Sequence, residues 1–334
     1  MGPLSRLVDT HGRVHRDLRI SLTDRCSLRC TYCMPAQGLP WLPREELLTT
    51  PELLRVVRVA VDLGIEEVRL TGGEPLLRPD LVDVVAGIAE LGVEVSMTTN
   101  ALGLDKKAEA LVAAGLTRVN ISLDTLRPET FRRLALRDRL DDTLRGIEAA
   151  AAAGLQPVKL NTVLMRDVND VEAVDLLEFA LAHGYQLRFI EQMPLDAGHT
   201  WTREGMVTGE EILTRLRTRY DLEPLPGRGS APAEQFLVDG GPATVGVIAS
   251  VTAPFCGACD RLRLTADGQL RSCLFARTET DLRAILRDEQ LTGPARDAAL
   301  ADAYRTCLAG KRPGHGIDDR TFLQPARPMS AIGG

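Results

Sequence analysis

The chain has 334 residues, of which 44% are hydrophobic, and its formal net charge is −6. This length and apolar content are sufficient for a buried core, and the negative charge argues against a general nucleic-acid-binding or membrane-surface protein. Residues 1–16 contain no apolar segment, and no apolar run reaches the roughly 18 residues that span a bilayer. We therefore predict a cytoplasmic protein that binds neither nucleic acid nor membranes.

The seven cysteines fall into three groups along the chain. Three lie within residues 26–33, three lie within residues 256–273, and Cys307 stands alone. An odd number of clustered cysteines favours metal ligation in a reducing compartment over a framework of disulfides.

The first group follows a predicted strand at residues 17–22, where polar and apolar residues alternate. Cys26, Cys30 and Cys33 have C-x3-C-x2-C spacing. A short loop of this kind gathers thiolates around an iron–sulfur cluster or a soft metal. A structural zinc site uses four ligands, so three thiolates leave either a distant fourth ligand or an open coordination position. Buried or disulfide-bonded cysteines are the alternative, although three thiols cannot form two disulfides.

This loop resembles the cluster-binding motif of the radical S-adenosylmethionine (SAM) enzymes, including Tyr32 immediately before the last cysteine. The resemblance implies that the three cysteines hold a [4Fe-4S] cluster whose fourth iron binds SAM. It also implies that the loop follows the first strand of a partial β/α barrel.

A repeated pattern of helix, glycine and strand follows the cysteine loop. The expected helices each end at a glycine, which favours the left-handed conformation after a helix, and they cover residues 51–63, 79–91, 106–114, 140–153 and 171–183. Runs rich in Val, Leu and Ile follow them at residues 66–71, 93–99, 117–123, 158–164 and 186–190. With a last helix near residues 209–219, the pattern predicts six parallel β/α units.

A repeat count does not decide whether the sheet closes, so the pattern alone also allows a doubly wound open sheet. Together with the cysteine loop, it favours an α/β fold with a partial (β/α)6 TIM-type barrel. Reactive groups of such folds gather at the carboxyl ends of the strands. The second strand ends in Gly72-Gly73-Glu74-Pro75, which resembles a glycine-rich motif of the radical SAM enzymes.

A C-terminal extension is predicted after a linker rich in Pro, Gly and Ser at residues 223–234. We therefore divide the chain into a barrel at residues 1–222 and a cluster-binding extension at residues 223–334. The extension is expected to contain a strand at residues 243–251 and a hairpin at residues 261–273 with a type I′ turn at Asp267-Gly268. Helices are expected near residues 280–287 and 295–308.

The second cysteine group, Cys256, Cys259 and Cys273, lies across the base of this hairpin. Zinc would need a fourth ligand, for which Cys307 and His315 are the candidates, whereas an open [4Fe-4S] cluster needs only three thiolates. Two arginines, Arg261 and Arg263, follow at strand spacing and leave the same face. Such a pair is often a solvated strand face, but beside an open cluster it predicts an anionic substrate.

Both cysteine groups, the Arg-x-Arg pair and the terminal Gly333-Gly334 together resemble the GTP 3′,8-cyclase family of molybdenum cofactor biosynthesis, over nearly the whole chain. The resemblance implies a lyase that takes a hydrogen from C3′ of GTP and joins C3′ to C8. Its product would be (8S)-3′,8-cyclo-7,8-dihydroguanosine 5′-triphosphate, in the first step of the pathway. It also implies SAM, two [4Fe-4S] clusters, a homodimer, an electron donor of the reductase/flavodoxin or ferredoxin type, and a downstream cyclic pyranopterin monophosphate synthase.

The resemblance also assigns residues. Expected SAM contacts are Tyr32, Gly73, Ser122 and Met193. Expected GTP contacts are Arg19, Arg69, Thr98, Lys159, Arg261 and Arg263. Expected catalytic residues are Arg19, Arg261, Arg263, Gly333 and Gly334, although a frayed terminus is the simpler interpretation of two last glycines.

Two positions depart from the family pattern. Two residues before Arg69, the family commonly has a lysine, but this chain has Glu67. The phosphate contact of that lysine is therefore in question, and another cation is expected to replace it. Cys307 matches no ligand position and is expected to be a small core residue.

Two alternative functions remain at this point. A radical SAM peptide-maturation enzyme with auxiliary clusters is one, although that class usually has more C-terminal cysteines. A non-catalytic iron–sulfur or zinc protein is the other, although it would not need polar residues at the strand ends.

Overall fold

A computed structural model describes residues 6–333, and its strands form one 12-stranded sheet in the order β12-β11-β10-β1-β2-β3-β4-β5-β6-β9-β8-β7. The six predicted strands are β1 (Asp17–Ser21), β2 (Glu67–Thr71), β3 (Glu94–Thr99), β4 (Leu116–Ser122), β5 (Lys159–Val163) and β6 (Gln186–Ile190). They are parallel and adjacent in chain order. A doubly wound sheet would reverse its strand order, so the barrel prediction is confirmed.

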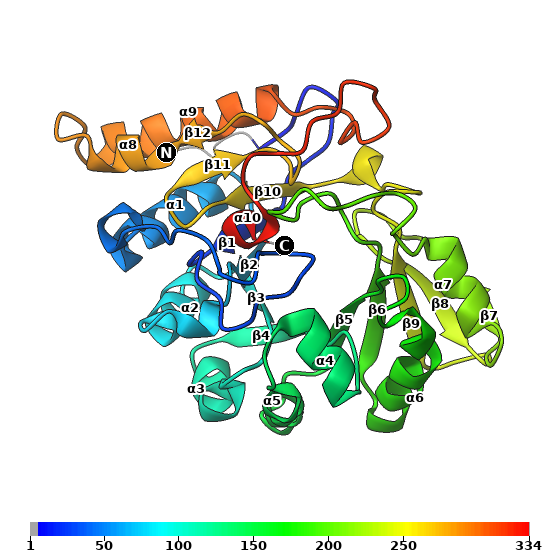
Figure 1. The fold of residues 1–334 in the computed structure, drawn as a ribbon. Helices are drawn as coiled ribbons and strands as arrows, with labels where there is room; N and C mark the ends of the chain where they lie inside the picture. Colours follow the sequence, from blue (N-terminus) through cyan, green and yellow to red (C-terminus); the bar gives the residue numbers. More distant parts are fainter. Residues whose placement is uncertain (1–5, 334) are drawn as a thin grey trace.

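The helices lie along the outer side of the curved sheet (Figure 1). The predicted ones are α1 (Thr50–Asp62), α2 (Leu81–Ala89), α3 (Ala108–Ala113), α5 (Leu140–Ala152), α6 (Ala173–His183) and α7 (Gly209–Leu216). The structure adds α4 (Pro128–Ala135), which we did not predict. The first helix begins with a capping box, in which Thr49 and Glu52 satisfy each other's backbone N–H groups.

Successive side chains along each strand point to opposite faces of the sheet, so one face is apolar and the other is polar. In β1, Leu18 and Ile20 are fully buried in the main hydrophobic core, which the helices share. Asp17 and Arg19 take the alternate positions, so their side chains point to the inner face of the barrel. The barrel therefore has an apolar shell and a polar inner face.

The C-terminal extension adds strands to both edges of this sheet. Strand β9 (Thr244–Ile248) pairs in parallel with β6, and β10 (Arg261–Leu264) pairs in parallel with β1. Strands β10, β1 to β6 and β9 thus form eight consecutive parallel strands. The proposed division at residue 222 stays a prediction, and both of its parts contribute to one sheet.

Two local predictions about the extension were wrong. Both ends of the expected linker belong to an antiparallel pair of strands, β7 (Leu222–Pro224) and β8 (Glu234–Val238). The hairpin of β10 and β11 (Gln269–Arg271) does not have a type I′ turn, because Gly268 has a φ of 81° but Asp267 has no positive φ. The Gly268 N–H donates to the Thr265 carbonyl (3.0 Å), as in a type I turn followed by a glycine bulge.

The chain then forms β12 (Thr280–Asp281), α8 (Leu282–Arg287), α9 (Gly293–Ala309) and α10 (Met329–Ile332). The short α10 lies inside the curve of the sheet, near β1 and β2 (Figure 1). Arg327 anchors the segment before it through two hydrogen bonds to the Asp267 carboxylate (2.8 and 3.0 Å). Gly334 lies outside the described residues. Within residues 6–333, no helix has both the length and the apolar composition needed to cross a bilayer.

Candidate active site

The first cysteine loop is fixed by the helix that the sequence did not predict. The backbone N–H groups of Arg29 and Thr31 donate to the carbonyls of Ala135 and Leu134 at the end of α4, each at 2.9 Å. The Arg29 guanidinium donates back to the Cys26 carbonyl (2.7 Å). Since the last carbonyls of a helix have no partner within it, α4 supplies free acceptors for this loop.

The three thiols of this loop are close enough to influence one another. Burial, and to a smaller extent Asp124 and the other two cysteines, raise the pKa of Cys30 well above its usual value. Burial also raises the pKa of Cys26 to about 11 and that of Cys33 to about 12. Three crowded thiolates need compensating positive charge, which the irons of a cluster would supply, so this donor set fits a [4Fe-4S] cluster.

The glycine-rich motif packs directly on this loop. The Gly73 N–H donates to the Thr23 carbonyl (2.7 Å), and a Cβ at Gly72 would approach that oxygen to 2.5 Å. Glu74 is buried and accepts from Thr99 Oγ1 and the Asn100 N–H, both at 2.7 Å. The glycines are therefore needed for close backbone contact here, and the SAM contact at Gly73 remains a prediction.

Tyr32 connects the cysteine loop to the end of β4. Its hydroxyl donates to Asp124 Oδ2 at 2.7 Å, and the other oxygen of that carboxylate accepts from the Val163 N–H at 2.9 Å. Burial raises the pKa of Asp124 to about 6. Ser122 ends β4 two residues before this aspartate, so the Tyr32 hydroxyl reaches the strand end that carries another expected SAM contact.

The second cysteine group lines a single cavity. Cys256, Cys259 and Cys273 share it with Arg261, Arg263 and Met193. The structure thus brings together all three thiols, both predicted arginines and one expected SAM contact. Three ligands of a four-iron cluster bind three different irons, so this arrangement fits a second cluster.

Cys259 has the most positive surroundings of this group. Lys311 is almost fully buried, and its ammonium donates to the Arg261 carbonyl (2.7 Å) and lies 3.7 Å from Cys259 Sγ. Burial raises the pKa of Cys259, but the charges of Arg261 and Lys311 outweigh it, so the net shift is downward. A thiolate is thereby favoured at this position. Lys311 was missed because nothing in the sequence placed it near the hairpin.

The zinc alternative lacks a suitable fourth ligand. His315 lines the same cavity, but its Nδ1 accepts from the Ile317 N–H (3.1 Å), so Nε2 carries the proton toward the Ser250 carbonyl (3.0 Å). Cys307 is buried in α9 as part of the main core, as expected. Within residues 6–333, no three His, Cys, Asp or Glu side chains converge closely enough to share one metal ion.

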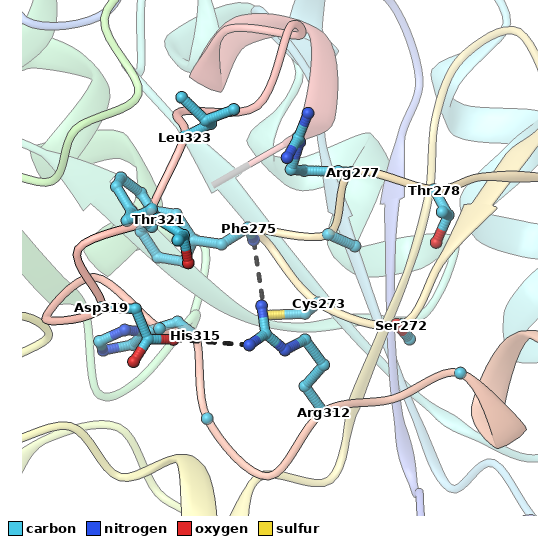
Figure 2. A pocket seen from close by; sticks show the side chains of 15 residues that line it. Ser272, Cys273, Phe275, Arg277, Thr278, Arg312, His315, Asp319, Thr321 and Leu323 are labelled. Carbon is cyan, nitrogen blue, oxygen red and sulfur yellow. Dashed lines mark hydrogen bonds and ion pairs between the residues drawn. The ribbon is translucent and has the colours of Figure 1, made fainter.

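A separate outer cavity reaches the second cysteine group from the surface. Figure 2 shows Cys273 at its floor, with the guanidinium of Arg312 in front and His315 and Phe275 at its sides. Arg312 is exposed and forms an ion pair with Asp319 at 3.5 Å. Cys273 therefore lies between this outer cavity and the cavity that contains Arg261 and Arg263.

Cations cover much of the inner face of the barrel. Arg263, Arg19 and Arg69 are register neighbours across β10, β1 and β2. Burial lowers the pKa of Arg19 well below its usual value; Asp17 opposes this shift and the neighbouring arginines add to it. Its Nε has no hydrogen-bond partner among the described residues, although it lies 3.6 Å from Asp17 Oδ2. Buried guanidinium groups this close to one another need a bound anion.

Two further cations of this face, Arg118 and Arg188, were missed in the sequence, and both influence the expected GTP contact Lys159. Burial lowers the pKa of Lys159 to about 8, and the nearby charges of Arg188, Arg118 and Arg69 contribute. Burial likewise lowers the pKa of Arg188 to about 10, with contributions from Arg69 and Arg118. Arg118 and Arg188 occupy alternate positions of β4 and β6, so strand alternation could have identified them. Thr98, another expected GTP contact, lies on β3 opposite Asn120.

The C-terminal tail enters this cationic region. The Gly333 carbonyl accepts a hydrogen bond from Arg263 Nη1, and Gly333 has a φ of 79°. A Cβ at this position would collide with Thr71 Oγ1. Ser330 is buried beside Cys33, and its contact lowers the pKa of that thiol against the larger effect of burial. The tail therefore passes from the first cysteine group to the arginines beside the second.

The comparisons with known proteins agree with this arrangement. Residues 20–180 match the radical SAM superfamily, and residues 185–317 match the family described as Molybdenum Cofactor Synthesis C. The fold is similar to that of Streptococcus suis SuiB bound to its precursor peptide SuiA, with a TM-score of 0.61, 15% identity and coverage of 90% of this chain and 69% of that chain. The barrel, its cysteine loop and these matches define a radical SAM enzyme.

Proteins with similar sequences identify the family to which this chain belongs. The chain is 62% identical to a GTP 3′,8-cyclase of Streptomyces coelicolor, covering 98% of this chain and 96% of the relative. It is 56% identical to a GTP 3′,8-cyclase of Mycolicibacterium smegmatis, covering 98% and 92%. The chain belongs to the GTP 3′,8-cyclase family.

Proposed function

We propose that this chain is a GTP 3′,8-cyclase that converts GTP to (8S)-3′,8-cyclo-7,8-dihydroguanosine 5′-triphosphate, the first step of molybdenum cofactor biosynthesis. The observation that carries the proposal is the cationic inner face between the two cysteine groups. A substrate with three phosphates supplies the anion that Arg19, Lys159 and Arg188 need. A small neutral or cationic substrate would leave these charges unbalanced.

In this proposal the two ends of GTP are held separately. When bound on Cys26, Cys30 and Cys33, a [4Fe-4S] cluster supplies the electron that cleaves SAM. The second cysteine group holds the guanine end, and the inner-face cations, which include Arg261 and Arg263, hold the phosphates. The ribose is then fixed between them with C3′ facing the first cysteine group, and this positioning is the protein's main contribution to selectivity.

Several finer assignments belong to the same proposal. SAM contacts Tyr32, Gly73, Ser122 and Met193, and GTP contacts Arg19, Arg69, Thr98, Lys159, Arg261 and Arg263. Cys256, Cys259 and Cys273 hold the second cluster, and residues 223–334 act as the cluster-binding extension. The proposal also includes an electron donor of the reductase/flavodoxin or ferredoxin type and a downstream cyclic pyranopterin monophosphate synthase. The enzyme is further proposed to be a cytoplasmic homodimer.

Elemental analysis tests the two-cluster assignment. Anaerobically reconstituted protein should contain roughly eight iron atoms and eight sulfides per chain, because each four-iron cluster carries four of each. Roughly four of each would leave the second cysteine group without a cluster. One zinc atom per chain would identify that group as a structural metal site instead.

Arg261→Ala and Arg263→Ala should each weaken GTP binding by about 1.5–3 kcal/mol, because each removes a charge-assisted contact to a phosphate. SAM binding should change much less. Titration calorimetry of the reconstituted variants with each ligand measures both affinities. Parent-like GTP binding by both variants would show that these arginines serve the fold or the tail alone.

A further inference from the structure

A carboxylate sits among the inner-face cations. Glu67 on β2 accepts from Arg69 Nη2 at 2.5 Å and lies 3.2 Å from Arg118 Nη2 on β4. Ser96 Oγ on the strand between them donates to the same Glu67 oxygen at 3.2 Å. Both arginines lower the pKa of Glu67 against the opposing effect of burial, so this carboxylate is charged. One carboxylate oxygen therefore connects three neighbouring strands.

The cluster lies inside the barrel, below the carboxyl ends of its strands. Glu67 and Arg118 each lie four residues before the carboxyl ends of their strands, which are Thr71 and Ser122. Four residues of strand span about 13 Å. A nucleotide whose ribose lies near the strand ends directs its outer phosphates toward this depth, and the long Arg118 side chain can cover the remaining distance.

Arg118 has donors left for such a ligand. Among the described residues, Arg118 pairs with Glu94 through Nε and with Glu67 through Nη2, while a guanidinium has five N–H donors. Its side chain is 27% exposed, so it is not locked in the core. Arg118 is also near enough to Lys159 and Arg188 to contribute to their pKa shifts.

We propose that Arg118 is a further phosphate-binding residue for the outer phosphates of the substrate, and that Glu67 is an internal competitor for the same two arginines. This inference rests on the proposed function. Before the nucleotide binds, Glu67 neutralises Arg69 and Arg118 and holds them at the right depth. The phosphates then accept part of the hydrogen bonds that Arg69 and Arg118 had donated to Glu67. The negative charge of the Glu67 carboxylate repels the phosphates and so opposes this exchange.

The first test removes the proposed phosphate contact. Arg118→Gln should weaken GTP binding about 10- to 100-fold, because a charge-assisted contact is lost, and should leave GMP binding within about twofold. Arg118→Lys keeps the charge and should recover part of the loss. The matched control is Arg145→Gln, which changes an arginine that is 57% exposed and paired with Asp142 on the outer helix α5. Calorimetric titration of the anaerobically reconstituted protein measures each affinity.

The second test removes the competitor. Glu67→Gln should tighten GTP binding several-fold, leave GMP binding unchanged and lower the melting temperature, because the inner-face cations lose their internal counter-charge. Glu94→Gln is the matched control, since Glu94 pairs with Arg118 but is 42% exposed and screened by solvent. It should change GTP affinity by less than about twofold.

The outcomes separate this inference from the proposed function. If the parent protein does not bind GTP, the proposed function fails before either variant is measured. If the parent binds GTP and Arg118→Gln binds it equally well, or loses GTP and GMP affinity by the same factor, Arg118 does not contact the outer phosphates. If Glu67→Gln weakens GTP binding, Glu67 assists the ligand and the competitor role is wrong.

Discussion

Cys30→Ser is expected to abolish the formation of 5′-deoxyadenosine, the largest single effect that we predict. Cys30 is the central thiol of the first group, is half-buried, and lies close enough to Cys26 and Cys33 to be influenced by both. A serine oxygen is a poor replacement for a thiolate at iron, so the cluster that reduces SAM would be incomplete. Chromatography of anaerobic reactions containing SAM and a chemical reductant measures the loss.

Cys259→Ser should have a different effect, because the second cysteine group lies in its own cavity beside Arg261 and Arg263. This variant should still cleave some SAM but yield no cyclised nucleotide. Cys307→Ser is the matched control: Cys307 packs in the core of α9 and should be dispensable for both reactions. Full cyclisation by the Cys259 variant would show that the second group is structural.

Gly333→Ala is expected to uncouple SAM cleavage from cyclisation. Its φ of 79° disfavours a side chain, and the added methyl group would collide with Thr71 Oγ1. The tail must then move away from Arg263, which donates to the Gly333 carbonyl. We expect the ratio of cyclised nucleotide to 5′-deoxyadenosine to fall at least about tenfold, because displacing a positioning group disturbs the reacting geometry. A tag after Gly334 should act in the same direction.

Gly310→Ala is the control for this prediction. Gly310 also lies in the C-terminal extension, but its φ is −86° and a Cβ there would meet nothing closer than 3.6 Å. It should keep the parent's product ratio. A Gly333→Ala enzyme with that same ratio would mean that the tail has no part in substrate positioning.

The sequence predicted the barrel well because its signals are local. Glycines after helices and Val-rich runs identified six β/α units, and the spacing of the cysteines identified both thiol groups. Helix α4 was missed because Pro128–Ala135 is short and Leu136, rather than glycine, takes the left-handed position after it. The pairing of β9 with β6 and of β10 with β1 depends on contacts between distant segments, which local patterns do not encode.

The candidate site was predicted unevenly for the same reason. The cysteines and the Arg261–Arg263 pair follow from spacing, and the assigned SAM and GTP contacts depended on the family resemblance. Lys311 lies 52 residues from Cys259 in the sequence, and only the folded chain brings them together. The pairing of Glu67 with Arg118 likewise joins two strands that are separated by β3.

The most direct test of the central claim follows the hydrogen at C3′ of the substrate. Reconstituted enzyme is incubated anaerobically with SAM, a reductant and GTP carrying deuterium at C3′, and the products are analysed by mass spectrometry. The account predicts that the deuterium appears in 5′-deoxyadenosine and that a cyclised nucleotide forms without the label. Formation of 5′-deoxyadenosine without deuterium, and without a cyclised nucleotide, would contradict it.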